Sequence, residues 1–419
     1  MRHLFLLLQV HRLVWSFLLL LVLCFLSTAA SDSERYSGPS QPVPESYFGM
    51  HVHRAASTTP WPAVSFAEWR LWDAEVAWPQ LEPERGKWDF TRLDQYVRIA
   101  AARRVHILLT LGLTPTWASS RPTEPSGYAK GNAAEPRSTA DWEQYVRMVA
   151  TRYKGVIHDY EVWNEPNAPA TFTGSVDAMV VLARAAYHVL KEVDPTNTVV
   201  SPSPTAQTGI LWLQHFLAHG GCQYADVIGY HFYVTPAPPE AMIPLIQKVH
   251  RLLQQPACTQ KPLWNTESGW TKPKYFSTEQ EAAAYVMRAY LLNWLMGIQR
   301  CYWYAWDNHN WSTLDLTLPV ALRPTRAGQA YGIIQQWMPG AVLSSCRRDH
   351  SGLWTCYLER EGSVDHVVWR DEGAQTFTIP PGWKARAVVT WTGELSRADL
   401  PVVVGPAPVF VSTDPACCR

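Results

Sequence analysis

Two short segments about a hundred residues apart contain the residue types that could do chemistry. They are Tyr160-Glu-Val-Trp-Asn-Glu-Pro-Asn167 and Leu263-Trp-Asn-Thr-Glu-Ser-Gly-Trp270. Each begins with apolar or aromatic residues typical of a buried strand and ends near an acidic residue, Glu165 or Glu267. A buried carboxylate is costly unless it is paired, hydrogen-bonded or used in a reaction. Two such carboxylates, one acid/base and one nucleophile, are the minimum that cleavage of a glycosidic bond requires.

The elements that must position these acids follow from the alternation of strand and helix patterns after Tyr47, which indicates repeated βα units and a parallel sheet. The expected strands are 48–53, 69–72, 106–111, 160–163, 198–201, 227–232, 262–265 and 301–305. The expected helices include 93–102, 140–153, 176–192, 243–254 and 278–296. Eight strands over about 260 residues predict an α/β fold, a TIM (β/α)8 barrel, with its active site where the strands end. Glu165 and Glu267 follow the fourth and seventh strands, so we expect them to meet at the barrel mouth.

The pattern changes after about Pro339, where short apolar runs are separated by Gly, Asp and Pro turns. These runs, 353–359, 364–369, 375–379 and 384–391, predict a small C-terminal all-β, sandwich-like module. The Pro-rich tail from Pro401 is expected to form an edge strand and a loose terminus. The expected organisation is a signal peptide (1–30), a leader or linker (31–46), a catalytic barrel (47–338), the β-module (339–413) and a tail (414–419).

The N-terminal segment predicts export. A weakly basic start precedes the apolar run Trp15–Leu26, and small residues follow it at Ser27–Ala30. This is typical of a cleaved secretory signal, so a secreted or periplasmic protein without stable membrane insertion is expected. Removing Cys24 leaves seven cysteines, an odd number, so at least one thiol is free or pairs between molecules. The disulfides expected in an oxidising compartment are Cys222–Cys258 and Cys346–Cys356.

The composition argues against nucleic acid as a partner. Lys+Arg and Asp+Glu both count 36, and no Lys/Arg run appears. The chain contains 21 Trp, 18 Tyr and 12 Phe. Aromatic rings suit the C–H faces of sugars and suit a large core equally well.

Two motifs resemble those of clan A, the retaining β-glycosidases with (β/α)8 barrels. They are Trp163-Asn-Glu-Pro-Asn167 after one strand and Thr266-Glu267 after another. The upstream stretches Trp78–Phe90 and Val105–Gly112 strengthen this resemblance. Within the clan the chain, over roughly residues 47–338, is most similar to glycoside hydrolase family 39, which includes β-xylosidases and bacterial exopolysaccharide hydrolases. The resemblance implies a carbohydrate substrate and no metal or organic cofactor.

By this resemblance, Glu165 is the acid/base and Glu267 the nucleophile of a retaining enzyme, whose carboxyl groups lie about 5–5.5 Å apart. An arginine at the position of Arg70 hydrogen-bonds the nucleophile and keeps it ionised. His231 and Tyr233 share one strand face and resemble the pair that contacts the nucleophile and the substrate.

Further residues are expected to contact the sugar. The amide of Asn164, beside the acid, could hold the 2-hydroxyl. Trp303 and Trp306 could form the floor of a subsite by stacking, with Asp307 and Asn308 contacting hydroxyls. The remaining expected contacts are Trp117 at the rim and the two histidines His51 and His53.

Two other functions remain open. His51 and His53 on one strand face, with His231 and Asp307, resemble the ligands of a metal-dependent amidohydrolase-type barrel. A sugar-binding barrel without catalysis is the third reading. The sequence leaves open the identity and linkage of the sugar, exo or endo action, the oligomeric state and the role of the β-module.

Overall fold

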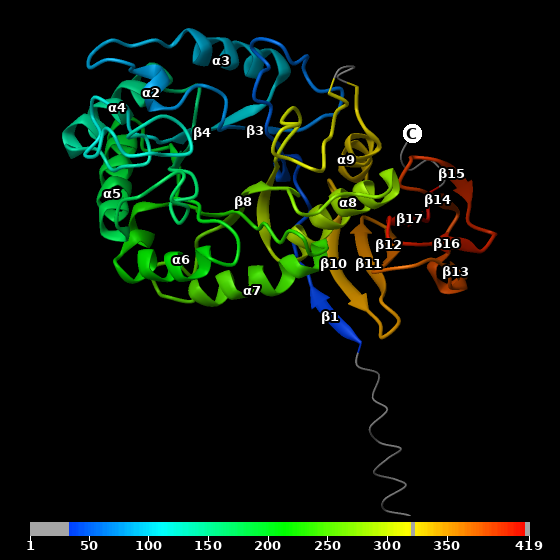
Figure 1. Ribbon diagram of the computed structural model, residues 1–419. Helices are drawn as coiled ribbons and strands as arrows, with labels where there is room; N and C mark the ends of the chain where they lie inside the picture. Colours follow the sequence, from blue (N-terminus) through cyan, green and yellow to red (C-terminus); the bar gives the residue numbers. More distant parts are fainter. Residues whose placement is uncertain (1–32, 320–322, 415–419) are drawn as a thin grey trace, which may run out of the picture.

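The protein is described by a computed structural model that covers residues 33–319 and 323–414 (Figure 1). The predicted signal peptide, most of the predicted tail and the cysteines Cys24, Cys417 and Cys418 lie outside these described residues.

Eight parallel strands form a nearly closed barrel, as predicted. They are β2 (Phe48–Met50), β3 (Glu68–Leu71), β4 (His106–Leu111), β5 (Asp159–Val162), β6 (Thr198–Val200), β7 (Ile228–Tyr230), β8 (Leu263–Ser268) and β9 (Ile298–Trp303). They pair in the order β6-β5-β4-β3-β2-β9-β8-β7, and every pair is parallel. Isolated parallel bridges Val200–Val227 and Thr205–His231 connect β6 to the β7 side.

The helices lie around the outside of these strands (Figure 1). The five predicted ones are α3 (Thr91–Arg103), α4 (Thr139–Arg152), α5 (Val176–Val193), α7 (Met242–Leu252) and α8 (Glu279–Leu295). The short helical turns are η1 (Glu45–Tyr47), η2 (Gly221–Tyr224), η3 (Pro239–Ala241) and η4 (Pro381–Trp383). Two of the five predicted helices begin with a capping side chain. Ser175 accepts a hydrogen bond from the N–H of Ala178, and Thr278 accepts one from the N–H of Glu281.

Three helices were not predicted: α2 (Trp78–Leu81), α6 (Gly209–Ala218) and α9 (Arg326–Trp337). α2 is a single turn, too short to show a period. α6 is apolar along most of its length and starts with a glycine. α9 contains Gly328 and Gly332, and glycine lowers helix propensity by about 1 kcal/mol. None of the three therefore shows a clear amphipathic pattern with good helix formers.

Antiparallel sheets form the C-terminal β-module. Its main sheet consists of β1 (Glu34–Ser37), β10 (Val342–Arg348), β11 (Leu353–Arg360), β12 (Ser363–Arg370), β17 (Val409–Ser412), β14 (Ala387–Val389) and β15 (Leu395–Arg397), in that order. A second, two-stranded sheet pairs β13 (Gln375–Phe377) with β16 (Val402–Val404). The module packs beside α8 and α9 (Figure 1). There the ring of Trp337 in α9 stacks on that of Phe410 in β17 at 5.2 Å.

Two expectations about the ends of the chain are corrected. The segment 31–46 is more than an exposed linker, because it contributes the edge strand β1, which pairs with β10. The tail is more than an edge strand, because β17 lies between β12 and β14 in the middle of the main sheet. Both pairings join segments far apart in the sequence, so local composition does not reveal them.

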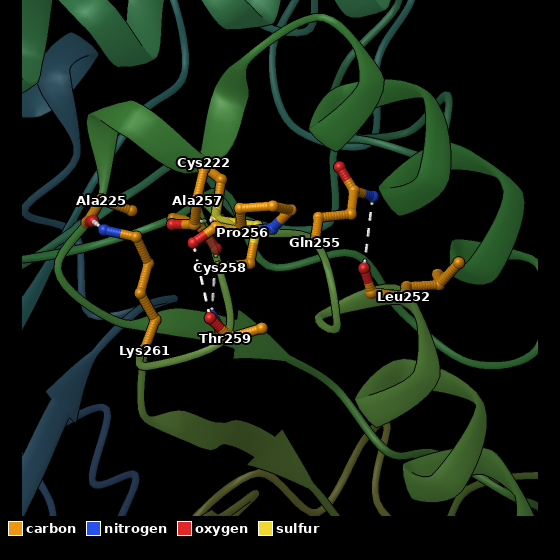
Figure 2. The surroundings of a disulfide bond; sticks show 11 residues. Cys222, Ala225, Leu252, Gln255, Pro256, Ala257, Cys258, Thr259 and Lys261 are labelled. Atoms are coloured by element: carbon orange, nitrogen blue, oxygen red, sulfur yellow. Dashed lines mark hydrogen bonds between the residues drawn. A yellow bond between two sulfur atoms is a disulfide. The ribbon is translucent and has the colours of Figure 1, made fainter.

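Both predicted disulfides are present, Cys222–Cys258 and Cys346–Cys356. The first links η2 to the turn before β8 (Figure 2), and the second joins the paired strands β10 and β11. Cys301 is free and buried. In the described part of the chain, no helix is long and apolar enough to span a membrane.

Candidate active site

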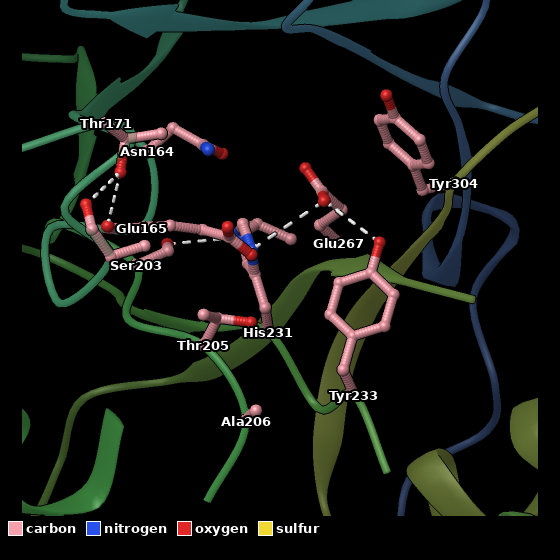
Figure 3. Close-up of polar contacts among 12 residues, drawn as sticks. Asn164, Glu165, Thr171, Ser203, Thr205, Ala206, His231, Tyr233, Glu267 and Tyr304 are labelled. Carbon is pink, nitrogen blue, oxygen red and sulfur yellow. Dashed lines mark hydrogen bonds and ion pairs between the residues drawn. The ribbon is translucent and has the colours of Figure 1, made fainter. Parts of the chain in front are cut away.

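Glu165 and Glu267 come together at the barrel mouth, where β5 and β8 end. Glu165 follows β5 in a left-handed backbone conformation (φ 43°), and its N–H donates to the carbonyl of Ser203 at 3.0 Å. Glu267 lies on β8, which continues past its predicted end at Asn265 to Ser268. His231 lies between the acids, its Nδ1 2.9 Å from Glu165 Oε1 and 4.0 Å from Glu267 Oε1 (Figure 3).

Arg70, on β3, is fully buried below the two acids. Its Nη1 donates to Glu267 Oε2 at 2.7 Å, as the resemblance implied, and its Nη2 donates to Asn164 Oδ1 at 2.8 Å. Its Nε donates to Glu161 Oε2 at 2.7 Å. The planar guanidinium thus fixes three acceptors from two strand ends in one geometry, which a lysine cannot do.

Glu161 is a site residue that the sequence reasoning missed, although it lies in the quoted segment. It is completely buried and accepts hydrogen bonds from Thr110 Oγ1 at 2.7 Å and Ser203 Oγ at 2.5 Å, besides that from Arg70. The positive charge of Arg70 and these hydrogen bonds hold the pKa of Glu161 below its ordinary value despite burial, which acts to raise it. The available signal was an acid in the middle of an otherwise apolar buried strand.

Tyr233 and His231 divide their contacts between the two acids. Tyr233 Oη donates to Glu267 Oε1 at 2.9 Å, whereas His231 Nδ1 bonds mainly to Glu165 (Figure 3). Both side chains therefore contact the acids, and the histidine lies closer to Glu165 than to Glu267. Glu267 accepts donors on both oxygens, from Tyr233 and from Arg70, and such hydrogen bonds favour the ionised carboxylate.

The protonation of the site is shared among neighbouring groups. Burial raises the pKa of Glu267, and the negative charges of Glu165 and Asp73 add to this against the positive charges of His231 and Arg70. Burial also acts to raise the pKa of Glu165, but the hydrogen bond and charge of His231 outweigh it and lower that pKa. The two carboxyl groups lie within 4.8 Å of each other, so they titrate as a coupled pair rather than as independent groups.

His51, His53 and Asp307 form a separate cluster on the β2 side. Asp307 accepts hydrogen bonds from His53 Nδ1 at 3.0 Å, from the backbone N–H groups of His53 and Arg54, and from Thr59 Oγ1. These contacts lower the pKa of Asp307 even though burial opposes them. His51 Nε2 lies 3.2 Å from the carbonyl of Thr266. Asp307 therefore fixes the loop after β2 and does not line the cavity described below.

The metal-ligand set of the amidohydrolase alternative is not assembled. Within residues 33–319 and 323–414, one group of three His, Cys, Asp or Glu side chains brings its ligand atoms within 4.8 Å of one another. It consists of Glu165, His231 and Glu267, and includes neither His51 and His53 nor Asp307. In this group Glu267 is already paired with the cation of Arg70.

The tryptophans expected to stack on sugar lie elsewhere. Trp303 and Trp306 are fully buried, and Trp303 packs against Trp270 at 5.9 Å. Trp117 is half-buried and donates its Nε1 hydrogen to the carbonyl of Glu82. We assign Trp303 and Trp306 to the core, because both are fully buried and neither lines the cavity described below, whereas Tyr304 between them does.

A cavity of about 450 Å³ opens above the two acids. It is lined by Glu165, Glu267, Asn164 and Asn308, which the sequence analysis named. It is also lined by side chains that the sequence analysis did not name, among them Trp72, Asp73, Tyr128, Tyr304, Asn310 and Trp311. Trp311 is 46% exposed, and its ring meets that of Tyr233 at 5.5 Å and that of Tyr304 at 5.1 Å. The size, the polar groups and the aromatic rim are those of a small-molecule site.

An eight-stranded parallel barrel with two carboxylates at its mouth has the architecture of a barrel glycoside hydrolase. Residues 75–305, more than half of the chain, match the sequence profile of Glycosyl hydrolases family 39, so the protein belongs to that family and is an enzyme that hydrolyses glycosides. No curated protein matches the sequence.

The fold is similar to that of solved glycoside hydrolases. One is a family 39 glycoside hydrolase from the gut symbiont Bacteroides cellulosilyticus WH2 (TM-score 0.71, 18% identity, covering 88% of this chain and 81% of that chain). Another is a monomeric beta-xylosidase from Caulobacter crescentus CB15 (TM-score 0.62, 16% identity, 90% and 97% covered). A third is the catalytic domain of GH30 xylanase C from Talaromyces cellulolyticus (TM-score 0.61, 14% identity, 91% and 100% covered).

Proposed function

We propose that the protein is a retaining β-glycosidase that acts by double displacement, with Glu165 as acid/base and Glu267 as nucleophile. The observation that carries the proposal is the spacing of the two acids. Their nearest oxygens lie within 4.8 Å, which fits the separation of about 5–5.5 Å between the carboxyl groups of a retaining enzyme.

In the first step, an oxygen of Glu267 attacks the anomeric carbon while Glu165 gives its proton to the departing glycosidic oxygen. The bond from the anomeric carbon to the aglycone breaks, and a glycosyl ester on Glu267 forms. Arg70 and Tyr233 orient the nucleophile through their hydrogen bonds. Asn164, held by Arg70 and lining the cavity, is positioned to bond the 2-hydroxyl.

In the second step, Glu165 takes a proton from water as the water oxygen attacks the anomeric carbon. The ester bond to Glu267 breaks, and the sugar leaves with its original configuration. The negative charge that returns to Glu267 is stabilised by the hydrogen bonds from Arg70 and Tyr233.

The proposed substrate is a β-linked oligo- or polysaccharide met outside the cytoplasm. The two disulfides fit an oxidising compartment, in keeping with the signal peptide predicted at residues 1–30. The proposed organisation is a catalytic barrel over residues 47–338 and an accessory β-module over 339–413. A solved structure similar in fold is named a beta-xylosidase, so β-xylosides belong in the first screen.

The test is the configuration of the first product. A panel of aryl β-glycosides and polysaccharides identifies a substrate, and proton NMR in the first minutes of turnover then reads the anomer. We expect the β-anomer; an α-anomer would refute double displacement.

Variants then test the two roles. Glu267→Ala should abolish turnover, and azide should trap a glycosyl azide of inverted configuration. Glu165→Ala should be rescued by azide with retained configuration. The matched control is Glu192→Ala, which removes an exposed glutamate paired with Arg147 on the outer helices and should leave the rate unchanged. Azide products of the opposite configurations would interchange the two roles.

A further inference from the structure

The carboxylate of Asp73 is held between two tyrosines on one wall of the active-site cavity. Tyr128 Oη donates to Asp73 Oδ1 at 2.8 Å, and Tyr304 Oη donates to Asp73 Oδ2 at 2.7 Å. Asn308 Nδ2 in turn donates to Tyr304 Oη at 2.6 Å. All four residues line the same cavity as Glu165 and Glu267.

Three separate elements build this wall. Asp73 follows β3, Tyr128 lies in the loop after β4, and Tyr304 directly follows β9. Asp73 has φ 55°, a left-handed conformation that few side chains other than Asn and Asp tolerate well. The position therefore combines a residue type suited to the backbone with a carboxylate placed against the reacting groups.

The hydrogen-bond capacity of the wall is almost entirely for accepting. Each tyrosine has one O–H hydrogen, and Tyr128 and Tyr304 both use theirs on Asp73. An ionised carboxylate offers about four acceptor positions, and the two tyrosines occupy two of those on Asp73. The groups left to face the cavity are therefore lone pairs, on the phenolic oxygens and on the Asp73 carboxylate. A ligand that satisfies this wall must donate hydrogen bonds, as sugar hydroxyls do.

The charges around the cavity also favour a neutral ligand. Among the described residues, its lining contains three carboxylates, Asp73, Glu165 and Glu267, and no lysine or arginine. Arg70 lies beneath it with a completely buried side chain, bonded to protein acceptors. A carboxylate or sulfate on the sugar would meet Asp73 at close range in a partly desolvated site without a cation to pair with.

We infer that Asp73 sets the substrate class of this site by accepting hydrogen bonds from hydroxyls of a neutral sugar and by excluding uronic acids and sulfated sugars. The inference rests on the proposed function only in taking a carbohydrate as the ligand.

Binding of non-hydrolysable 4-nitrophenyl 1-thio-β-glycosides tests this directly, measured by titration calorimetry. The probes are the xyloside and two pairs that differ only at C6, glucoside with glucuronide and galactoside with galacturonide. We expect the wild type to bind at least one neutral member at least tenfold more tightly than its uronide. Asp73→Asn, which suits the same backbone conformation, should lower the neutral-to-uronide ratio about tenfold, because a hydrogen bond to a charged group and the like-charge repulsion are both lost.

Two further variants separate specificity from folding. Asp94→Asn is the matched control, because Asp94 also accepts a tyrosine hydroxyl, from Tyr153 at 2.7 Å, but on the outer helices; it should leave the ratio unchanged. Tyr128→Phe removes a donor to Asp73 but keeps the carboxylate, so the uronides should still be rejected. Thermal unfolding midpoints show whether each variant is folded.

The outcomes are distinct from those of the proposed mechanism. A wild type that prefers uronides, that binds no probe, or whose ratio is unchanged by Asp73→Asn would overturn the role of Asp73. A product of inverted configuration would refute double displacement but would leave the role of Asp73 unaffected, because binding of thioglycosides involves no bond cleavage.

Discussion

Removing the hydroxyl of Tyr233 should slow the second step of the reaction more than the first. In Tyr233→Phe the ring still packs against Trp311, and Glu267 keeps its bond to Arg70, so a single 2.9 Å hydrogen bond is lost. A hydrogen bond to a charged group contributes about 1.5–3 kcal/mol. Because each 1.36 kcal/mol of activation free energy changes the rate tenfold, this loss corresponds to a rate about 10- to 100-fold lower. The hydrogen bond from Tyr233 contributes most in the second step, the breakdown of the glycosyl ester, because negative charge then returns to Glu267.

The assay is pre-steady-state kinetics with a 2,4-dinitrophenyl β-glycoside of the preferred sugar. We expect kcat and KM to fall together, a burst of dinitrophenol close to one per enzyme, and a glycosylated Glu267 peptide by mass spectrometry. Tyr47→Phe removes a buried hydroxyl bonded to the carbonyl of Tyr290, away from the cavity, and should leave the kinetics unchanged. A higher KM without a burst would contradict the reasoning, because it would show that Tyr233 acts only in binding.

Three other predictions follow from charges and covalent links. Glu161→Gln should move the acid limb of the kcat/KM profile to lower pH by about one unit, because Arg70 then shares its charge with Glu267 alone; no shift would show that Glu161 is not coupled to the nucleophile. Replacing Cys222 and Cys258 by Ala opens a link across 36 residues and should cost about 2–4 kcal/mol of stability, seen as a lower Tm with unchanged kcat at 25 °C. Burial raises the pKa of Glu68 from 4.5 to about 8, against the opposing charge of Arg300, so the folded state holds a proton that the unfolded state loses. The free energy of unfolding should therefore fall as pH rises from about 5 to 8, and Glu68→Gln should flatten this slope in denaturant titrations; an unchanged slope would assign the dependence to another group.

The barrel was predictable because its signals are local. Several of the barrel strands contain short apolar runs, such as β4 and β6, and α5 and α8 begin with Ser175 and Thr278, residues that favour helix starts. β1 and β17 were misjudged for the opposite reason. Their partners lie in other parts of the sequence, β10 for β1 and β12 with β14 for β17, and a strand's place in an antiparallel sheet depends on that pairing rather than on its own composition.

The site residues also differ in whether local sequence predicts them. Glu165, Glu267 and Arg70 could be expected to meet because they lie near strand ends, and the parallel strands of a barrel end at one rim. Trp303 and Trp306 were placed wrongly, and Tyr304 between them was missed. After the end of a strand, the path of the backbone decides which side chains face the cavity, and the sequence does not show that path. Asp73 carried no signal of its own, since its role arises only when Tyr128 and Tyr304 arrive from the loop after β4 and the end of β9. The proposed catalytic acids are thus encoded by local sequence pattern, whereas the wall that we propose selects the sugar is formed where separate loops meet. On this proposal, substrate preference can change while the catalytic pair stays in place.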